Sequence, residues 1–397
     1  MTIRRMQNLG IAYMCLIITS CTFNNKQEKK TAEELSFFSV NNSDVKSETE
    51  LPLSQLLESL EIIPLENKDE AFSKIGVIYI SDNYIGCQPY DQSPYKLFDR
   101  KGKFIGDIGA IGQGPGEYRN VYFSQINEKK ERIYIVSHNA KKILTYDLKG
   151  IFLENECIPL VAMLPKGNCY VDNEHKTVTV INLPFQGKQK MVCWTQDFSG
   201  KLLQYVSAAQ YAVIPDYSNE VYSFRNTSSY DFQLGVFYQE KPDTLYHYNV
   251  KNNSVNPVFT LNAPIKAGTL GYRYMELPDD YLVARLNLRM GANPDNDVES
   301  TKLILTNKKT KKSQYVRIIN DYLGGWEFDP FFLSFRIRDG YFTYAMEPIE
   351  LKELLEESLK KDDLQPEVRK RITELNAKLD INDNNVILAG KLKKIKT

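Results

Sequence analysis

The sequence lacks the residue patterns that mark most catalytic and metal sites. Its 397 residues include three histidines, His138, His175 and His247, and no two of them have the short spacing of a metal-binding pair. No Cys-x-x-Cys pair and no Gly-x-Ser-x-Gly elbow for a nucleophilic serine is present. The sequence alone therefore assigns no catalytic residue, no metal ligands and no cofactor.

An excess of charge of one sign is also missing. The 50 lysines and arginines balance the 50 aspartates and glutamates. The one dense basic run, residues 308–312, stands between two strand patterns and is most simply a solvated turn. Because nucleic-acid binding relies on a basic surface that neutralises phosphates, we expect no nucleic-acid partner.

The first twenty residues are typical of an export signal. Arg4 and Arg5 precede an apolar stretch, residues 9–18, that is too short to cross about 30 Å of hydrocarbon as a helix. The stretch ends in Ile18-Thr-Ser-Cys21, which resembles the lipobox of bacterial lipoproteins. The resemblance implies a signal peptide over residues 1–20 and a lipid on Cys21 that holds the protein on the outer membrane, facing the periplasm or the cell surface. An ordinary signal peptide and an uncleaved anchor are the alternatives.

The segment after Cys21 predicts a tether. Residues 21–50 are rich in Asn, Lys, Glu, Ser and Thr and show almost no apolar periodicity, so they cannot bury enough apolar surface to fold. As a flexible coil the segment would reach about 30 Å. We expect the folded part to span residues 51–397.

Few cysteines are left for disulfides. The predicted mature chain holds Cys87, Cys157, Cys169 and Cys193 besides Cys21. A location outside the cytoplasm permits a disulfide, for which Cys157, Cys169 and Cys193 are the candidates. Isolated buried thiols are the simpler expectation.

Short strand patterns fill the chain beyond residue 60. Runs of β-branched and aromatic residues alternate with turns rich in Asp, Asn, Gly and Lys. They recur in units of about 45 to 55 residues, the spacing of a four-stranded propeller blade. The six units contain strand patterns at 77–80, 84–86, 95–98 and 104–108; 132–136, 143–147 and 150–153; 177–181, 191–194 and 201–205; 234–238, 244–248 and 256–260; 281–284, 302–305 and 313–317; and 335–338 and 341–344. The sequence predicts an all-β fold, a six-bladed β-propeller; a two-domain sandwich would not explain the steady period.

Two helical stripes interrupt the sixth unit. The apolar residues of the stripes are Leu351, Leu354, Leu355 and Leu359, then Val368, Ile372, Leu375 and Leu379. A strand pattern returns at 385–392, so we predict a helical-pair insertion over about residues 348–380 in the last blade. Residues 60–65 would supply the outer strand of that blade, so that both ends of the folded part close the ring and leave no open sheet edge.

Glycines gather in one loop after the first unit. The residues of this loop are Gly112, Gly114, Pro115, Gly116, Glu117 and Tyr118. A phosphate-binding loop would lead into a helix whose first N–H groups face the anion, but the next clear element is the strand pattern at 132–136. We therefore interpret the loop as the crossing between two blades, with Gly-Pro-Gly forming the turn and Glu117 and Tyr118 holding it in place.

Several segments carry a family resemblance. They are Ile108 to Tyr118 with the glycine loop, 243–248 with 257–259, 321–330, and 384–393. Together they resemble the six-bladed β-propeller lipoproteins of Bacteroidetes, of the NHL-like or TolB-like type, over roughly residues 50–397 in the expected order. The resemblance implies a propeller fold and an envelope location, and little chemistry, because most members of that family lack an assigned activity.

Two segments are candidates for ligand contact. Tyr322 and Trp326 lie in an aromatic loop around Gly324 and Gly325, which would face a ligand at the channel, although filling the gap between blades is the simpler expectation. Residues 293–297 are rich in acids and amides but lack the spacing of a calcium loop, so we assign no metal.

The patterns favour a binding module over an enzyme. We expect a monomeric, non-catalytic envelope propeller that binds a peptide, glycan or protein partner at the face of its central channel. The alternative is a lactonase-like propeller hydrolase or lyase, in which acids from several blades hold a metal at the channel.

Overall fold

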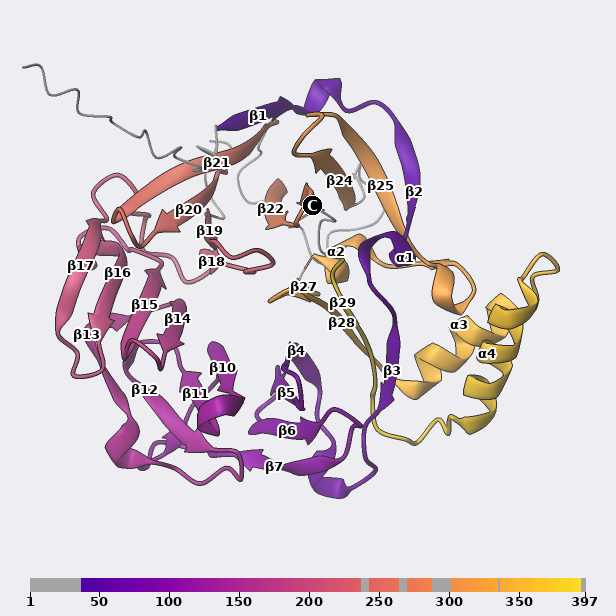
Figure 1. The fold of residues 1–397 in the computed structure, drawn as a ribbon, viewed down its shortest axis with the longest axis horizontal. Helices are drawn as coiled ribbons and strands as arrows, with labels where there is room; N and C mark the ends of the chain where they lie inside the picture. Colours follow the sequence, from indigo (N-terminus) through magenta and orange to yellow (C-terminus); the bar gives the residue numbers. More distant parts are fainter. Residues whose placement is uncertain (1–36, 237–242, 264–269, 288–300, 335, 394–397) are drawn as a thin grey trace, which may run out of the picture. The chain divides into compact units, whose positions relative to one another are not determined.

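The computed structural model describes residues 37–236, 243–263, 270–287, 301–334 and 336–393. The chain divides into two units, Met1–Ser36 and Phe37–Thr397, and all described residues belong to the second. In these residues six sheets, each built on four antiparallel strands, are the blades of a β-propeller (Figure 1). The predicted six-bladed fold is confirmed.

The first three blades follow one another along the chain. Blade one comprises β4 (Ile75–Ile80), β5 (Tyr84–Pro89), β6 (Tyr95–Asp99) and β7 (Phe104–Ile108). Blade two comprises β10 (Phe123–Asn127), β11 (Arg132–Val136), β12 (Ala140–Asp147) and β13 (Ile158–Leu164). Blade three comprises β14 (Gly167–Asp172), β15 (Thr177–Asn182), β16 (Met191–Asp197) and β17 (Leu202–Ser207).

The last three blades each include a strand from the N-terminal part of the folded unit. Blade four comprises β18 (Glu220–Tyr222), β19 (Tyr230–Gly235), β20 (Leu245–Asn249), β21 (Ser254–Asn262) and β1 (Phe38–Asn41). Blade five comprises β22 (Leu270–Glu276), β23 (Asp280–Asn287), β24 (Lys302–Asn307), β25 (Ser313–Asn320) and β2 (Glu48–Pro52), with β26 (Trp326–Glu327) beside β25. Blade six comprises β27 (Ile337–Arg338), β28 (Tyr341–Met346), β29 (Val386–Lys391) and β3 (Glu61–Pro64).

Short elements complete the described part. A two-stranded parallel sheet joins β8 (Ala110–Ile111) to β9 (Glu117–Tyr118) in the glycine loop. The short helices are α1 (Leu53–Leu56), α2 (Pro330–Leu333), η1 (Asn42–Asp44), η2 (Asp69–Ala71), η3 (Glu128–Lys130), η4 (Glu154–Glu156) and η5 (Asp321–Leu323). No helix among the described residues is both long and apolar enough to span a bilayer.

Four inner strands and one outer strand differ from the sequence-based prediction. β18 and β22 were not predicted, since the fourth and fifth units were expected to begin at residues 234 and 281. β10 and β14 were not predicted, because their sequences Phe-Ser-Gln-Ile-Asn and Gly-Asn-Cys-Tyr-Val-Asp mix polar residues with apolar ones. The strand predicted at 150–153 is wrong. There Phe152 makes only an isolated bridge to Tyr146, and the outer strand of blade two is β13, which follows η4.

Three hairpin turns share the pattern Asp-x-x-Gly and one geometry. In each turn the aspartate Oδ1 accepts hydrogen bonds from two backbone N–H groups, and the glycine holds a positive φ that suits a residue without a Cβ. The pairs are Asp99 with Gly102, Asp147 with Gly150, and Asp197 with Gly200, at glycine φ values of 85°, 83° and 85°. The turn at Gly102 is the first of this series along the chain.

The turn glycines also bring neighbouring blades together. A Cβ at Gly102 would lie 2.1 Å from the carbonyl oxygen of Pro64 on β3, and one at Gly150 would lie 2.2 Å from that of Asp107 on β7. Since no real Cβ approaches a backbone oxygen so closely, only glycine lets each turn sit on the outer strand of the preceding blade.

The N-terminal part of the folded unit covers the outer edges of three blades. β1 pairs in parallel with β21, β2 pairs in parallel with β25, and β3 pairs antiparallel with β29 (Figure 1). The predicted start of the fold near Leu51 is therefore corrected to Phe37, and residues 37–50 are not tether. The segment is polar, but the backbone hydrogen bonds to exposed edges and the burial of Val40 and Val45 order it. Residues 21–36 lie outside the described part.

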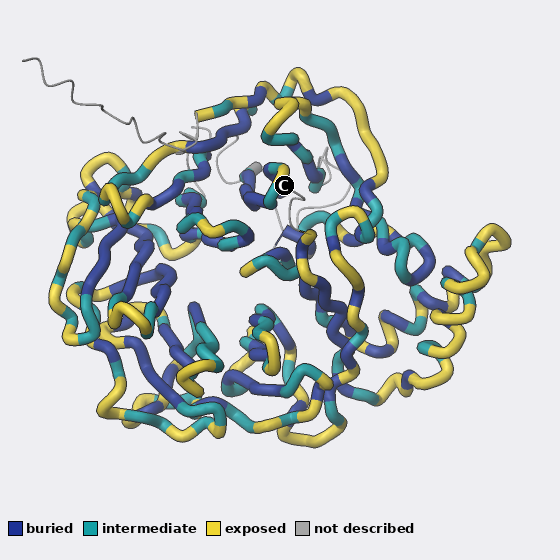
Figure 2. The backbone as a smooth tube through the Cα atoms, in the orientation of Figure 1, coloured by how far each residue is buried: buried dark blue, intermediate teal, exposed yellow. Residues whose placement is uncertain are grey.

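The helical insertion lies where the sequence predicts it. α3 (Pro348–Leu359) and α4 (Pro366–Lys378) stand between β28 and β29, and β3 supplies the outer strand of that blade. Leu351 and Leu355 of α3 are fully buried against blades five and six, whereas most of α4 is exposed (Figure 2). The insertion is therefore a packing element on the outside of the last blade.

We expect the edge strands to stabilise the fold. A chain beginning at Leu53 loses β1 and β2 and the buried side chains of Val40, Val45 and Leu51. Each such side chain contributes about 1.5–3 kcal/mol, so the free energy of unfolding should fall by roughly 5 kcal/mol relative to a chain beginning at Phe37. Urea unfolding of the two truncated proteins measures the difference; equal midpoints would contradict the role of the edge strands.

Candidate functional site

The first strand of each blade lies nearest the propeller axis (Figure 1). On these inner strands aromatic rings touch from blade to blade: Tyr79 meets Phe123 at 6.2 Å between centroids, and Phe123 meets Tyr170 at 5.3 Å. Arg338 on β27 continues the series, with its guanidinium 5.5 Å from the Tyr79 ring and 5.6 Å from the Phe224 ring. The inner side of the propeller thus combines aromatic faces with arginines.

A pocket of about 350 Å³ opens beside this aromatic series, and we call it the arginine pocket. It lies at the inner ends of blades two, three and four. Its lining residues are Gln125, Asn127, Lys129, Lys130, Tyr170, Val171, Asp172, Asn173, Glu174, Arg225 and Tyr230. Its volume falls at the lower end of the range for small-ligand sites.

Arg225 is held in the pocket by its backbone. It follows β18 and has a φ of 53°, the left-handed region that costs a residue with a Cβ about 1 kcal/mol or more. Asp231 stabilises this conformation, because its carboxylate accepts the N–H of Arg225 at 2.7 Å and that of Phe224 at 3.2 Å. The guanidinium then lies 4.3 Å from the ring of Tyr170 and 5.1 Å from that of Tyr230.

Two donors in the pocket have no acceptor. The Nε of Arg225 is buried and has no hydrogen-bond partner among the described residues, and Arg225 forms no ion pair with them. The Nδ2 of Asn173 is likewise buried and unpartnered, while its Oδ1 accepts the hydroxyl of Tyr134 at 2.8 Å. Because a buried donor without an acceptor costs about 1–3 kcal/mol, the pocket is suited to a ligand that brings acceptors.

Acids as well as bases line the pocket: Asp172 and Glu174 stand beside Arg225, Lys129 and Lys130. Asp172 accepts the N–H groups of Glu174 and His175, and its pKa is lowered first by the backbone bond from His175. Asp339, in the turn after β27, has its pKa raised by burial, while the charges of Arg338 and Arg225 oppose that rise. Lys129 and Lys130 are exposed and form no ion pair with described residues. The three cations of the lining thus outnumber its two carboxylates by one.

A second polar cluster differs from the arginine pocket in that all the hydrogen-bond donors of its lysine have acceptors. Lys166 is buried; it donates to the carbonyl oxygens of Tyr217 at 2.6 Å and Asn219 at 3.0 Å, and it pairs with Glu220. The hydroxyl of Tyr122 donates to the same carboxylate at 2.6 Å. All three protons of Lys166 have acceptors, so this cluster ties inner strands together and leaves nothing for a ligand.

The glycine loop is held by the two residues that the sequence suggests. Glu117 accepts the N–H of Gly114 at 2.7 Å, and a Cβ at Gly112 would lie 2.0 Å from the same carboxylate. Tyr118 is buried; its hydroxyl donates to the carbonyl of Ile108 and accepts the N–H of Tyr95 at 2.8 Å. These contacts fix the crossing from blade one to blade two, while Pro115 and Gly116 complete its turn.

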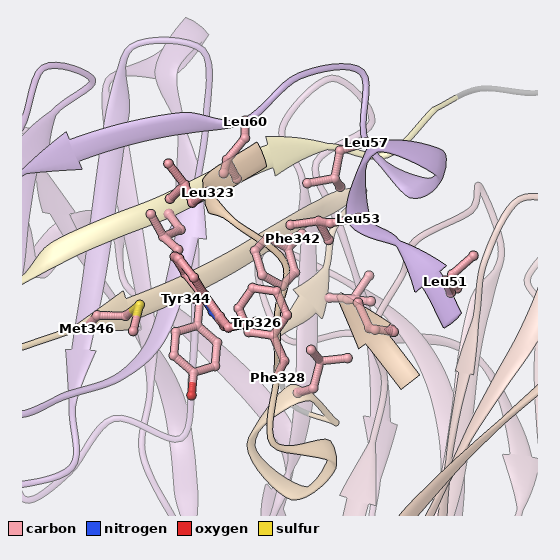
Figure 3. Packing of buried hydrophobic residues seen from close by; sticks show 14 of the residues in the cluster. Leu51, Leu53, Leu57, Leu60, Leu323, Trp326, Phe328, Phe342, Tyr344 and Met346 are labelled. Carbon is pink, nitrogen blue, oxygen red and sulfur yellow. The ribbon is translucent and has the colours of Figure 1, made fainter. Parts of the chain in front are cut away.

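The aromatic loop before blade six is packed inside the protein. Trp326 is 9% exposed and lies in a cluster with Phe328, Phe342 and Tyr344 (Figure 3). Tyr322 packs against the same cluster, and its hydroxyl reaches the carbonyl of Leu57 at 3.5 Å. The structure therefore gives Tyr322 and Trp326 a packing role between blades, and it does not bring them to the arginine pocket.

Other sequence candidates are also separated from the pocket. His138 packs on Tyr122 at 4.8 Å with a pKa lowered by burial, and His247 pairs with Glu276 at 2.6 Å in blades four and five. Cys87, Cys157, Cys169 and Cys193 are free thiols. Within the described ranges no three His, Cys, Asp or Glu side chains gather as metal ligands. Residues 293–297 and Cys21 lie outside these ranges.

Sequence reasoning missed Arg225, Asn173 and Asp231. No motif surrounds them, and their roles depend on three different blades. One signal was present: an arginine between Phe224 and Asn226, in a turn that a glycine or asparagine would normally fill.

A family model matches most of the chain. The model is described as "Domain of unknown function (DUF4934)", and it matches residues 35–391. No curated protein matches the sequence.

The chain is similar to solved structures from Bacteroides. A crystal structure from Bacteroides fragilis, of a protein whose name suggests that it is exported, has a TM-score of 0.60 and 16% identity, and covers 90% of this chain and 100% of its own. A DUF4221 family member from Bacteroides vulgatus has a TM-score of 0.46 and 10% identity, and covers 85% of this chain and 98% of its own. The first similarity supports the fold; the NHL-like or TolB-like type stays a prediction.

Asp231 should give the stability a pH dependence. Burial raises its pKa from 3.8 to about 6, and Glu276 adds to that rise while the backbone donors and His247 oppose it. The folded state therefore binds the proton more tightly, and the contribution of Asp231 to stability is full below pH 3.8 and is lost as the pH rises through about 6.

We expect Asp231→Asn to remove this loss, which amounts to roughly 2 kcal/mol between pH 4 and pH 7. Urea unfolding across that range measures the slope for wild type and variant. Asp172→Asn is the matched control, because the pKa of Asp172 is lowered and its titration falls below the range. The same slope in wild type and Asp231→Asn would contradict the raised pKa.

Proposed function

The chain belongs to the DUF4934 family, and we propose that it is an exported, lipid-anchored propeller that binds an acidic glycan in the arginine pocket without changing it chemically. The observation that carries the proposal is that Arg225 and Asn173, which line one pocket, each hold a buried donor with no acceptor among the described residues. An acidic sugar supplies what both lack.

The chemistry of the pocket favours a carboxylate or sulfate group. A guanidinium donates two parallel hydrogen bonds to such a group, and this geometry is stronger and more selective than a single contact. Lys129 and Lys130 at the edge add attraction at longer range. The ligand's negative charge would also oppose the mutual repulsion of these cations.

The remaining lining suits a sugar ring. Tyr230 presents an aromatic side chain and Asn127 an amide, which together match the apolar faces and hydroxyl groups of a saccharide. The amide of Gln125 is already paired with the backbone of Val171. A pocket of about 350 Å³ has room for a sugar unit. A stable protein interface buries about 1,200 Å² or more of total surface, which a pocket this small does not provide. We therefore favour a glycan over a peptide or protein partner.

Export and anchoring complete the proposal. The signal pattern before Cys21 supports them, as does the similar Bacteroides fragilis protein whose name suggests export. The absence of a catalytic motif from the sequence supports a binding role. An anchored propeller of this kind would hold a glycan close to the cell envelope.

We expect the protein to bind trigalacturonate and not the neutral trigalactose. Arg225→Ala should weaken binding at least tenfold, since a charge-assisted pair contributes about 1.5–3 kcal/mol and 1.4 kcal/mol is a factor of ten. Arg225→Lys should restore binding only in part, because lysine keeps the charge and loses the fork. Isothermal titration calorimetry measures all six combinations of the three proteins and the two sugars.

Lys370→Ala, on the exposed face of α4, is the matched control and should bind as wild type does. Equal binding of the acidic and neutral sugars, or an unchanged affinity in Arg225→Ala, would overturn the proposal. If triglutamate binds more tightly than trigalacturonate, the ligand is an acidic peptide and the glycan proposal is wrong. Shortening of trigalacturonate, seen by mass spectrometry, would contradict a non-catalytic role.

The lipid anchor is tested separately in cells. Full-length protein should incorporate an alkyne-labelled palmitate and partition with detergent, and Cys21→Ser should lose both properties, because Cys21 is the proposed acceptor. Cys157→Ser is the control and should stay labelled. Incorporation of the labelled palmitate by Cys21→Ser would disprove the anchor at Cys21. It would not affect the glycan proposal.

A further inference from the structure

A larger pocket lies away from the propeller axis, between the outer part of blade two and the face of blade three. We call it the edge pocket; its volume is about 680 Å³. Its apolar lining comprises Met163 of β13 with Met191, Trp194, Leu202 and Tyr205 of blade three. Met163 is 43% exposed and Tyr205 is 49% exposed, so apolar surface faces solvent at the entrance.

One buried polar atom of the edge pocket is left without a partner. Asn182, at the end of β15, is 1% exposed and lines the pocket. Its Nδ2 donates to the carbonyl of Met191 at 2.9 Å, which fixes the orientation of the amide. Its Oδ1 is buried and has no partner among the described residues. A ligand that brings an O–H or N–H donor would satisfy this acceptor.

Positive charge stands at the entrance. Lys188 and Lys190 belong to the turn between β15 and β16 and line the same pocket. Both are exposed, and neither side chain forms an ion pair with a described residue. No acid lines the pocket, so the two lysines would attract an anionic group to its entrance.

We propose that the edge pocket binds an amphipathic organic anion, a long-chain carboxylate that carries a hydroxyl group. The aliphatic chain packs on Trp194 and the two methionines, whose flexible side chains adapt to an extended chain. The hydroxyl donates to Oδ1 of Asn182, and the carboxylate lies near Lys188 and Lys190. The inference is independent of the glycan proposal, because the two pockets share no residue.

The dimensions and chemistry favour a small molecule over a protein segment. The volume of about 680 Å³ is in the range of drug-sized ligand sites, which combine a mainly apolar lining with a few placed polar groups. The binding of a protein segment would not explain a single buried acceptor such as Oδ1 of Asn182. The edge pocket has such an acceptor and a lysine pair at its entrance.

Tryptophan fluorescence tests the proposal, because Trp194 lines the pocket and the chain has only one other tryptophan, Trp326. We expect 12-hydroxydodecanoate or 3-hydroxydodecanoate to change the emission with saturation, about tenfold more tightly than the methyl ester and several-fold more tightly than dodecanoate. Trp194→Phe should abolish the change, which assigns the signal to this pocket.

Two sets of variants separate the contacts. Lys188→Glu with Lys190→Glu should weaken binding of the acids at least tenfold and leave the methyl ester unaffected; Lys370→Glu is the matched control. Both lysines are exposed, so this variant should fold as wild type does. Asn182→Ala should remove the preference for the hydroxyl while dodecanoate still binds.

Several results would overturn the inference. They are the lack of saturable change with any probe, a change that persists in Trp194→Phe, and equal affinity for acid and ester. Unchanged binding in the double lysine variant would do so as well. The glycan titration with Arg225→Ala is unaffected by any of these outcomes.

Discussion

The pairing of β3 with β29 is the contact on which the rest of the propeller depends. A propeller is stable only if its last blade is completed, and here the outer strand of blade six comes from residues that precede blade one. Pro64 of β3 also receives the Gly102 turn of blade one, and the N–H of Glu66 bonds to the Gly102 carbonyl at 2.9 Å. One short strand thus closes blade six and fixes blade one to it.

Closure of this kind shapes what the inner side can do. The other strands of each blade hold its inner strand rigid. A rigid strand can keep a polar group available to a ligand, whereas in a flexible loop the group would form hydrogen bonds with its own backbone. The buried ion pair of Lys166 and Glu220 uses that rigidity for stability. Arg225 uses it differently: Asp231 holds its backbone in a strained conformation, and its buried Nε has no acceptor among the described residues. The contrast between the two clusters is the physical basis for placing ligand binding at the second.

Much of the fold was predictable from local patterns, and little of the site was. The strands of blade one, the helical insertion and the closing role of residues 60–65 follow from alternation, amphipathic stripes and spacing, which are properties of neighbouring residues. β1 and β2 were missed because their stability comes from sheet edges more than 200 residues away in sequence. Trp326 was a candidate for ligand contact because the sequence does not show whether an aromatic side chain in a loop is exposed or buried. The structure shows that Trp326 is buried against Phe328 and Tyr344.

The sequence by itself determined the class of fold and the number of blades, since backbone propensity and periodicity act over a few residues. It also determined that no familiar catalytic or metal motif is present. Only the tertiary structure decided which polar groups lack partners. Arg225, Asn173 and Asn182 are ordinary residues along the chain, and they become candidate binding groups because neighbouring blades bury one polar atom of each that has no partner among the described residues.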